Sequence, residues 1–572
     1  MPRRFYISMH RCIDRKPNHP FSKQQLRVEQ QQERASAMAA QVLQQVYHSL
    51  HDLLWHDTSS PQASAMATSV LLVAFPLLAL LLVRRRLSSS SAATAAREQQ
   101  LAKLPSPPGR LPVIGHLHLM GSLPHVTLCD LAAKHGRDGL LLLRLGSVPT
   151  LFVSSARAAQ AVLRTNDHAF SSRCDSAVAG IIFYGPSDAA FCPYGEHWRQ
   201  VKKIATTHLL TNKKVRSYRH AREREVRLVL DKVREAAKTR TVIDLTEMLN
   251  EFSNDIISHA VSGSYPRDEN TNALFRELTE ANSTLLGGFN LDDYFPVLAK
   301  LGIVRRMLCA GAHKVNQRWD ELLDRLIDAH ERRPASERGE ESDFIDVLLS
   351  LKEEYNLTRD HIKAQLVVMF QAGTDTSFVA LDNVIVELVR NPAVMAKLQA
   401  EVRTAVPKGK EMVTEDDLES FTYLRAIIKE TLRLRIPAPL LVPHLSMADA
   451  DVEGYTIPSG TRVLINVGAL SKDPSYWEKP EEFIPERFME GGSAAAMDFR
   501  GNDFPFLPFG SGRRMCPGIN FAMPMIELTV ANLVYHFNWE LPPGEKGVDM
   551  TEAFGLTVHR VKNLHVVPVV PH

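Results

Sequence analysis

The sequence has few cysteines, and none of its six stands close to another in the chain. Zinc sites and secreted disulfide frameworks need cysteines at paired, close spacings, so this pattern is typical of neither and favours a reducing compartment. A strong net charge is also lacking: the formal charge is +2, so we expect no nucleic-acid partner. The question is therefore which single cysteine carries chemistry.

Internal repeats and domain-sized linkers are absent too, although 572 residues would allow about four domains. The patterns predict one large unit, mainly α with small β-sheets. The longest helix is expected from the N-cap Thr358 to the stop signal Asn391-Pro392. Hairpins are expected over 140–153 and 452–466, and a polar surface loop over 332–342.

One apolar run near the N-terminus is long enough to suggest an anchor. It extends from Val70 to Val83 and is followed at once by three arginines, 84–86. With the mildly polar residues before it, the segment 65–86 approaches the roughly 20 residues that span a bilayer. The arginines would stay cytosolic, and the catalytic body with them. A cleaved signal peptide is disfavoured because the run begins far from residue 1.

The remaining boundaries follow from that anchor. Residues 1–37 are basic, which opposes the orientation, so we expect a disordered or mis-annotated extension and a true start at Met38 (or Met66). Residues 38–64 would be a lumenal segment. Residues 87–112 would be a linker with a stiff hinge at Leu104–Pro112, which is too proline-rich for helix or central strand. Residues 113–572 would form the body.

The segment 509–518, FGSGRRMCPG, contains the cysteine of interest, Cys516. A thiolate that pushes electron density onto an iron needs backbone N–H groups and a helix N-terminus to stabilise it. Gly512 and Gly518 would let the backbone approach a flat macrocycle, Arg514 has the reach for a propionate, and Phe509 can cover the sulfur. The bland alternative is a buried cysteine in a glycine-rich turn.

This segment matches the haem-binding signature of the cytochrome P450 family, which the chain resembles from Leu104 to Pro568. The resemblance implies the P450 fold, a haem-thiolate monooxygenase domain over 113–572, haem b, and Cys516 as its axial iron ligand. It also implies electrons from NADPH through a flavin-containing NADPH-cytochrome reductase, and an endoplasmic reticulum membrane location with a cytosolic catalytic domain.

Two residues in the middle of the long helix, Asp375 and Thr376, follow a glycine that costs about 1 kcal/mol in a helix. Thr376 can bond back to a carbonyl one turn earlier and open the helix. Alone, the motif would indicate a Ser/Thr-rich kink. By resemblance, the two residues are the acid–alcohol pair that delivers protons during catalysis.

Glu430 and Arg433 share one helix face, a pattern that alone indicates a surface ion pair. By resemblance they form the E-x-x-R pair, buried behind the haem and joined by Arg487, with a structural role.

Further haem contacts follow from the resemblance. Trp198 and Lys202 face one way, with lysine where the family usually has arginine, and His444 stands where many relatives carry a propionate-binding arginine. Arg435-Ile436 and Gly468 also depart from the common His-Pro and Trp. Between Trp198 and Arg222 lie eight lysines and arginines and no acid, either a solvated face or a dock for the reductase.

The substrate pocket is also assigned by resemblance. Its candidates are apolar or aromatic, which suggests a small hydrophobic substrate, although each could equally be core: Ile181, Ile182, Phe183, Phe370, Ala438, Pro439, Leu440, Phe554 and Leu556.

Three segments, 111–120, 285–296 and 357–361, look like plant microsomal enzymes of the grass benzoxazinoid pathway, which hydroxylate indole-derived specialised metabolites such as indole and indolin-2-one. The alternatives are a haem-thiolate isomerase or dehydratase that needs no reductase, and a non-catalytic haem-binding protein. Intact Asp375-Thr376 argues against the first. Asn282-Ser283-Thr284 is a glycosylation sequon that a cytosolic location would leave unused.

Overall fold

The computed structural model describes residues 92–263, 269–288, 290–300, 302–333 and 342–571. Contacts divide the chain into two units, 1–59 and 60–572, and the first lies wholly outside the described residues. The predicted extension, lumenal segment and anchor (65–86) also lie outside them. Within the ranges that the structure describes, no helix combines the length and apolarity needed to cross a membrane.

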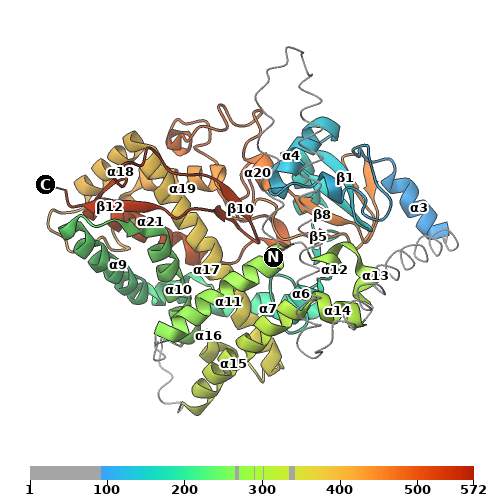
Figure 1. The fold of residues 1–572 in the computed structure, drawn as a ribbon, viewed down its shortest axis with the longest axis horizontal. Coiled ribbons are helices and arrows are strands. Elements are labelled where there is room, and N and C mark those ends of the chain that lie inside the picture. Colours follow the sequence, from blue (N-terminus) through green and yellow to red (C-terminus); the bar gives the residue numbers. More distant parts are fainter. Residues whose placement is uncertain (1–91, 264–268, 289, 301, 334–341, 572) are drawn as a thin grey trace, which may run out of the picture. The chain divides into compact units, whose positions relative to one another are not determined.

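Helices make up most of the described body (Figure 1). Those before the longest helix are α3 (Ala92–Leu101), α4 (Pro124–His135), α5 (Ala156–Gln160), α6 (Ala177–Ile182), α7 (Glu196–Ile204), α8 (Asn212–Ser217), α9 (Arg219–Thr239), α10 (Leu245–Ser262), α11 (Glu269–Gly287), α12 (Leu291–Tyr294), α13 (Pro296–Ala299), α14 (Gly302–Leu308), α15 (Ala310–Arg332) and α16 (Phe344–Ser350). Then follow α17 (Arg359–Arg390), α18 (Pro392–Ala405), α19 (Thr422–Leu434), α20 (Val467–Leu470) and α21 (Ile519–His536).

Four small sheets complete the body. Their strands are β1 (Leu140–Leu145), β2 (Val148–Val153), β3 (Ser172–Arg173), β4 (Ile243–Asp244), β5 (His444–Leu445), β6 (Ala450–Val452), β7 (Tyr455–Ile457), β8 (Arg462–Ile465), β9 (Asn538–Glu540), β10 (Glu552–Phe554), β11 (Val558–Arg560) and β12 (His565–Val569). The largest has the order β1-β2-β8-β5-β3, and β1 pairs with β2 antiparallel from Leu140↔Val153 to Leu145↔Val148.

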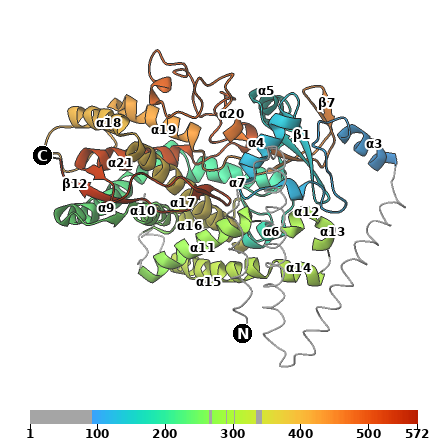
Figure 2. The ribbon, with the colours of Figure 1, turned by 45° about the horizontal axis from the view of Figure 1, so that its top comes forward.

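The long helix α17 begins and ends where the sequence predicts. The Thr358 hydroxyl accepts from the backbone N–H of His361, and the His361 ring accepts from the Thr358 N–H, which together make a capping box. The helix ends at Asn391, and Pro392 starts α18 in a new direction. Most of α17 is buried, because α10, α11, α15, α16, α19 and α21 pack around it. Figure 2 shows it running through the helical region beside α10 and α11.

One expectation about local structure is wrong. The hairpin over 452–466 does not exist: β7 pairs with β6 around the left-handed turn Glu453-Gly454, whereas β8 pairs with β2 in parallel and with β5. The linker predicted over 87–112 is described from residue 92 onward, and residues of this part are buried in the body. Its helix α3 ends in fully buried Leu101, buried Leu104 joins the same core, and Pro105 accepts a hydrogen bond from the Leu142 amide.

Candidate active site

The loop before α21 holds the sulfur of Cys516 close to backbone. The Gly518 N–H donates to Sγ at 3.3 Å, and the Cys516 N–H donates to the Phe509 carbonyl at 3.0 Å. Among the five cysteines that the structure describes, Cys516 alone is exposed. Protein atoms nevertheless surround the thiol, and this burial raises its pKa, whereas the Gly518 amide and the Lys202 ammonium oppose the rise. The arrangement favours a thiolate once a cation binds to it.

The glycines of this loop have different roles. Gly512 has φ +69°, and a Cβ there would lie 2.4 Å from the Leu163 carbonyl oxygen, so only glycine fits without strain. A Cβ on Gly518 would lie 3.6 Å from the Cys516 sulfur, which is an ordinary contact. Phe509 packs edge to face against Phe499, with ring centroids 5.5 Å apart, and this contact fixes the start of the loop.

Two cations converge on the Trp198 ring. The Arg514 guanidinium lies 4.0 Å from the ring centroid and the Lys202 ammonium 5.4 Å. The Trp198 indole N–H donates to the Ala189 carbonyl at 3.1 Å, and Lys202 donates to the Arg513 carbonyl. Burial and the neighbouring Arg514 lower the pKa of Lys202 to about 8, and burial lowers that of Arg514 to about 10. The lowered pKa values show that Lys202 and Arg514 lie close together and buried, with too little negative charge nearby to offset their own.

A third cation, Arg173, was not foreseen from the sequence. It pairs with His444 across the antiparallel β3–β5 ladder. His444 shares its Nδ1 hydrogen with the Phe170 carbonyl at 2.7 Å, and burial followed by the charge of Arg173 lowers the His444 pKa well below its usual value. Burial and Arg514 lower the pKa of Arg173 to about 9. His444 is therefore neutral, and the charge at this position belongs to Arg173.

The predicted acid–alcohol pair lies in the middle of α17. The Thr376 hydroxyl donates to the Ala372 carbonyl at 2.6 Å, one turn earlier, as expected. The Asp375 carboxyl turns the other way and accepts from the hydroxyls of Ser283 at 2.8 Å and Thr557 at 3.0 Å. Burial raises the pKa of Asp375, and the two hydroxyls partly offset that effect. No motif in the sequence marks Ser283 or Thr557 as partners of Asp375.

Glu430, Arg433 and Arg487 form a buried cluster instead of a surface pair. Glu430 accepts from Arg433 Nε at 2.7 Å and Nη2 at 2.9 Å, from the Ile484 amide at 2.8 Å, and from Arg487 at 3.4 Å. Arg433 also donates to the carbonyls of Ser471, Pro480 and Glu482. The cluster joins α19 to the loop that precedes the cysteine segment.

The predicted pocket residues come from α6, α17, the loop 438–440 and the β10–β11 turn. The Val558 N–H donates to the Pro437 carbonyl at 2.8 Å, which joins two of these segments. Phe183 and Phe370 are fully buried and stack on Phe191 at 5.1 Å and Phe275 at 4.3 Å. Ile182 and Pro439 are buried as well. Partly exposed surface, available to a ligand, is found on Ile181, Ala438, Leu440, Phe554 and Leu556.

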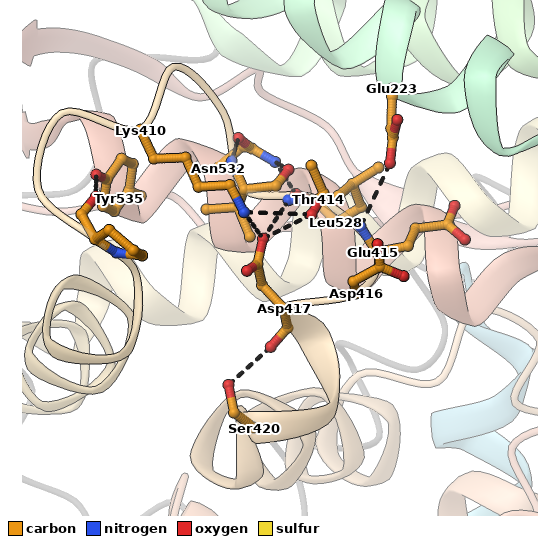
Figure 3. Close-up of polar contacts among 12 residues, drawn as sticks. Glu223, Lys410, Thr414, Glu415, Asp416, Asp417, Ser420, Leu528, Asn532 and Tyr535 are labelled. Atoms are coloured by element: carbon orange, nitrogen blue, oxygen red, sulfur yellow. Dashed lines mark hydrogen bonds and ion pairs between the residues drawn. The ribbon is translucent and has the colours of Figure 1, made fainter.

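Acids from other parts of the chain pair with some of the cations in the basic segment 198–222. Arg219 forms paired hydrogen bonds with Asp416, and buried Arg222 bonds Glu415. Figure 3 shows these two acids beside Glu223, in a loop that Asp417 holds through Lys410 and Thr414. Three cations of the segment are exposed and have no acidic partner in the described part of the chain: Lys203, Lys213 and Arg216.

The model of the family named Cytochrome P450 matches residues 105–567. The chain belongs to the cytochrome P450 family. Among curated relatives from Zea mays, indole-2-monooxygenase is 52% identical over 533 residues, covering 92% of this chain and 99% of that protein. Indolin-2-one monooxygenase is 53% identical over 481 residues, covering 82% and 90%. The chain is therefore a P450 monooxygenase.

Solved P450 structures share the fold. A zebra fish cytochrome P450 in a structure with progesterone superposes with a TM-score of 0.67 at 24% identity, covering 78% of this chain and 99% of that one. A second zebra fish structure, with abiraterone, gives a TM-score of 0.65. At this identity the similarity concerns the fold alone.

P450 membership implies a haem iron with a cysteine thiolate ligand, and the residues present fit this group. The Arg514 Nη1 is buried without a hydrogen-bond partner in the described part of the structure. Arg173, Lys202 and Arg514 each have a pKa lowered by burial, so the two haem propionates would supply the missing opposite charge. Cys516 would hold the iron. The assignments of individual site residues stay predictions.

Proposed function

We propose that this P450 hydroxylates a small indole-derived substrate, using dioxygen and NADPH electrons delivered by a flavin reductase. The observation that carries the substrate class is the 52% identity to indole-2-monooxygenase along nearly the whole of both chains. The partly exposed apolar residues among the predicted pocket positions support a small, hydrophobic substrate. Specificity among related monooxygenases depends on few pocket residues, so the position of hydroxylation is a matter for experiment.

Each polar residue has a defined task in this proposal. When bound, the haem activates dioxygen and supplies the oxygen atom that enters the substrate. Cys516 would hold the iron and donate electron density to it, and the Gly518 amide, which donates a hydrogen bond to the sulfur, would favour the thiolate. Thr376 presents a hydroxyl that donates to the Ala372 carbonyl, one turn earlier in the continuous helix α17. Asp375, one residue earlier, takes up and releases the proton that this hydroxyl passes on.

The location and the electron donor belong to the same proposal. The segment 65–86, whose apolar run ends in three arginines, would anchor the chain in the endoplasmic reticulum membrane and leave the catalytic body cytosolic. An NADPH-cytochrome reductase on the same membrane would then meet the exposed cations of the segment 198–222.

The test is hydroxylation of indole and indolin-2-one in microsomes that contain the full chain and a plant flavin reductase. A hydroxylated product that requires NADPH is expected. In Thr376→Ala, NADPH oxidation should continue while product falls at least tenfold, because proton delivery contributes about 10²-fold or more. Cys516→Ser should remove the thiolate-specific absorption of the reduced carbon monoxide complex.

Two controls separate the parts of the proposal. A second preparation that starts at Met38 shows whether the first 37 residues matter. A haem-loaded, reducible enzyme that forms no product from either compound would remove the indole assignment and leave the P450 monooxygenase class intact. Product formation without NADPH or reductase would remove the electron route.

A further inference from the structure

Asp375 is tied to two elements outside its own helix. Its Oδ2 accepts from Ser283 of α11 and from Thr557 of the β10–β11 turn. Thr557 is 1% exposed, and its hydroxyl donates to Asp375. Both donors are hydroxyls, which can give one proton and accept another, unlike an ammonium or guanidinium group. The carboxyl is therefore held by groups that are themselves able to relay a proton.

The two donors are built into one junction. A Cβ on Gly287, at the end of α11, would lie 2.0 Å from backbone atoms of Gly555 and Leu556. The Leu556 N–H also donates to the Ser283 carbonyl, at 3.4 Å. Backbone meets backbone here, so α11 and the β10–β11 turn present their hydroxyls to α17 as one unit. Figures 1 and 2 show α11 beside α17.

Buried polar atoms without partners lie between α11 and α17. Phe275 stacks on Phe370 at 4.3 Å, and Ser283 bonds Asp375, so these two contacts bound a short stretch of the interface. Helical periodicity places the polar residues of this stretch on the facing sides of the two helices. We call it the polar seam, and its members are Thr279 and Asn282 of α11 with Gln371 and Thr374 of α17.

Six side-chain atoms of the polar seam lack a hydrogen-bond partner among the described residues: Thr279 Oγ1, both amide atoms of Asn282, both amide atoms of Gln371, and Thr374 Oγ1. The four side chains are between 0% and 5% exposed. Leaving one such group unpaired costs about 1–3 kcal/mol, so a whole cluster is untenable unless something else satisfies it. Buried water, which makes two to four hydrogen bonds, would satisfy these donors and acceptors.

The burial of Asn282 also bears on the glycosylation sequon Asn282-Ser283-Thr284. Asn282 is 0% exposed and faces the interior of the body, so the Asn-Ser-Thr triplet cannot accept a glycan in the folded chain, wherever the chain resides. Its first two residues instead lie at the seam and at Asp375.

We propose that Ser283 and Thr557 are positioning residues that hold the Asp375 carboxyl and connect it to water held in the polar seam. A water in the seam passes a proton to the Ser283 oxygen as that hydroxyl gives its own proton to Asp375. The serine is unchanged, the carboxyl gains one proton, and the water chain loses one. The inference rests on the proposed role of Asp375 in proton delivery.

Two further ionisable groups act on Asp375 from the elements packed against it. His559 of β11 favours the carboxylate, and Glu280 of α11 disfavours it. Both are exposed, in contrast to the seam. Any change in the Asp375 titration must therefore be compared with a variant that leaves these two residues in place.

The experiment uses the full-length holoenzyme with Ser283→Ala, Thr557→Val, both together, and Asn282→Leu. The first two should each raise the pKa of Asp375 by about one, because each removes a hydrogen bond to a charged group. An infrared pH titration measures this, with the Asp375 band identified by its loss in Asp375→Asn. Each should also lower product formed per NADPH consumed by about threefold, and the double variant by about tenfold.

Asn282→Leu tests the water separately. It fills the seam with an apolar side chain of similar size, so product per NADPH should fall while the Asp375 pKa stays unchanged. Thr284→Ala, on the exposed side of α11, is the matched control. Ser283→Thr keeps the hydroxyl, so it should retain the product formed per NADPH that Ser283→Ala loses. A high-resolution crystal structure should show ordered water bonded to Asn282, Gln371 or Thr374.

Three results would overturn the proposal. One is a drop in the thermal midpoint of Ser283→Ala or Thr557→Val with unchanged coupling and unchanged Asp375 titration, which is the signature of a purely structural contact. Another is a dry seam in which the amides of Asn282 and Gln371 bond each other. The third is unchanged coupling in Asn282→Leu. The infrared titration needs no substrate, so failure to hydroxylate indole compounds would be recognised independently.

Discussion

At the scale of single residues, Glu430 offers the clearest test of stability. It is fully buried and accepts hydrogen bonds from Arg433, Arg487 and the Ile484 amide. Glu430→Gln keeps the shape but leaves two buried guanidinium groups without their counter-charge, so the unfolding free energy should fall by about 3–5 kcal/mol. Denaturant unfolding measures this. Glu486→Gln, which breaks the exposed Lys397 pair, is the control and should cost less than about 1 kcal/mol. A loss of that same small size at Glu430 would contradict the buried-cluster argument.

Residue-level inference from the sequence works where a motif is contiguous. The segment 509–518 could be interpreted in full because ligand, glycines and arginine occur within ten residues. Arg173 could not be found that way: it is a lone arginine in a two-residue strand, and only its long-range pairing with His444 brings it into the cationic cluster. Ser283 and Thr557 meet Asp375 from 92 and 182 residues away, so no local pattern marks them.

At the scale of elements, Glu527 makes the stability of α21 depend on pH. Burial raises its pKa from 4.5 to about 7, and Glu415 adds to the rise while Arg425 opposes it. The folded chain therefore holds this proton more tightly than the unfolded chain does. Its stabilising effect is complete below about pH 4.5 and is lost as the pH rises to about 7.

Glu527→Gln should remove this dependence and stabilise the fold at pH 8 by about 3 kcal/mol relative to the parent chain. Denaturant midpoints of both proteins at pH 5 and pH 8 provide the measurement, with Glu545→Gln, an exposed position, as the matched control. Equal pH dependence in parent and Glu527→Gln would show that the carboxyl titrates normally.

Elements follow from sequence when their signals are local. The caps of α17 and the β1–β2 hairpin are set by neighbouring residues, and both form as predicted. The prediction of a 452–466 hairpin is wrong because β8 extends a larger sheet instead. Its parallel partner β2 lies some 300 residues earlier in the chain. The two strands pair at four positions, Thr150↔Arg462 to Val153↔Ile465. Pairing register over such distances is a tertiary property, which strand propensity does not encode.

At the scale of the whole molecule, long-range ion pairs decide which basic residues remain available to a partner protein. The segment 198–222 is uniformly basic in sequence, yet the loop before α19 supplies Glu415 and Asp416, which occupy Arg222 and Arg219. A docking surface for the reductase therefore reduces to the exposed cations Lys203, Lys213 and Arg216. Reversing these three charges should slow reduction by the reductase about tenfold at low salt, because steering depends on exposed charge.

Stopped-flow reduction over a range of salt concentrations measures this effect. Salt slows reduction of the parent chain by screening attraction between exposed charges, with a Debye length of about 8 Å at physiological ionic strength. The reduction rate of Lys203→Glu/Lys213→Glu/Arg216→Glu should therefore depend less on salt, because the attracting charges are gone. Lys103→Glu/Lys134→Glu/Lys546→Glu makes the same net change at exposed positions outside the segment and should retain the parent rate. Equal slowing in both triple variants would mean that the reductase responds to net charge and has no specific dock here. Slowing in the first alone places the dock on the basic segment.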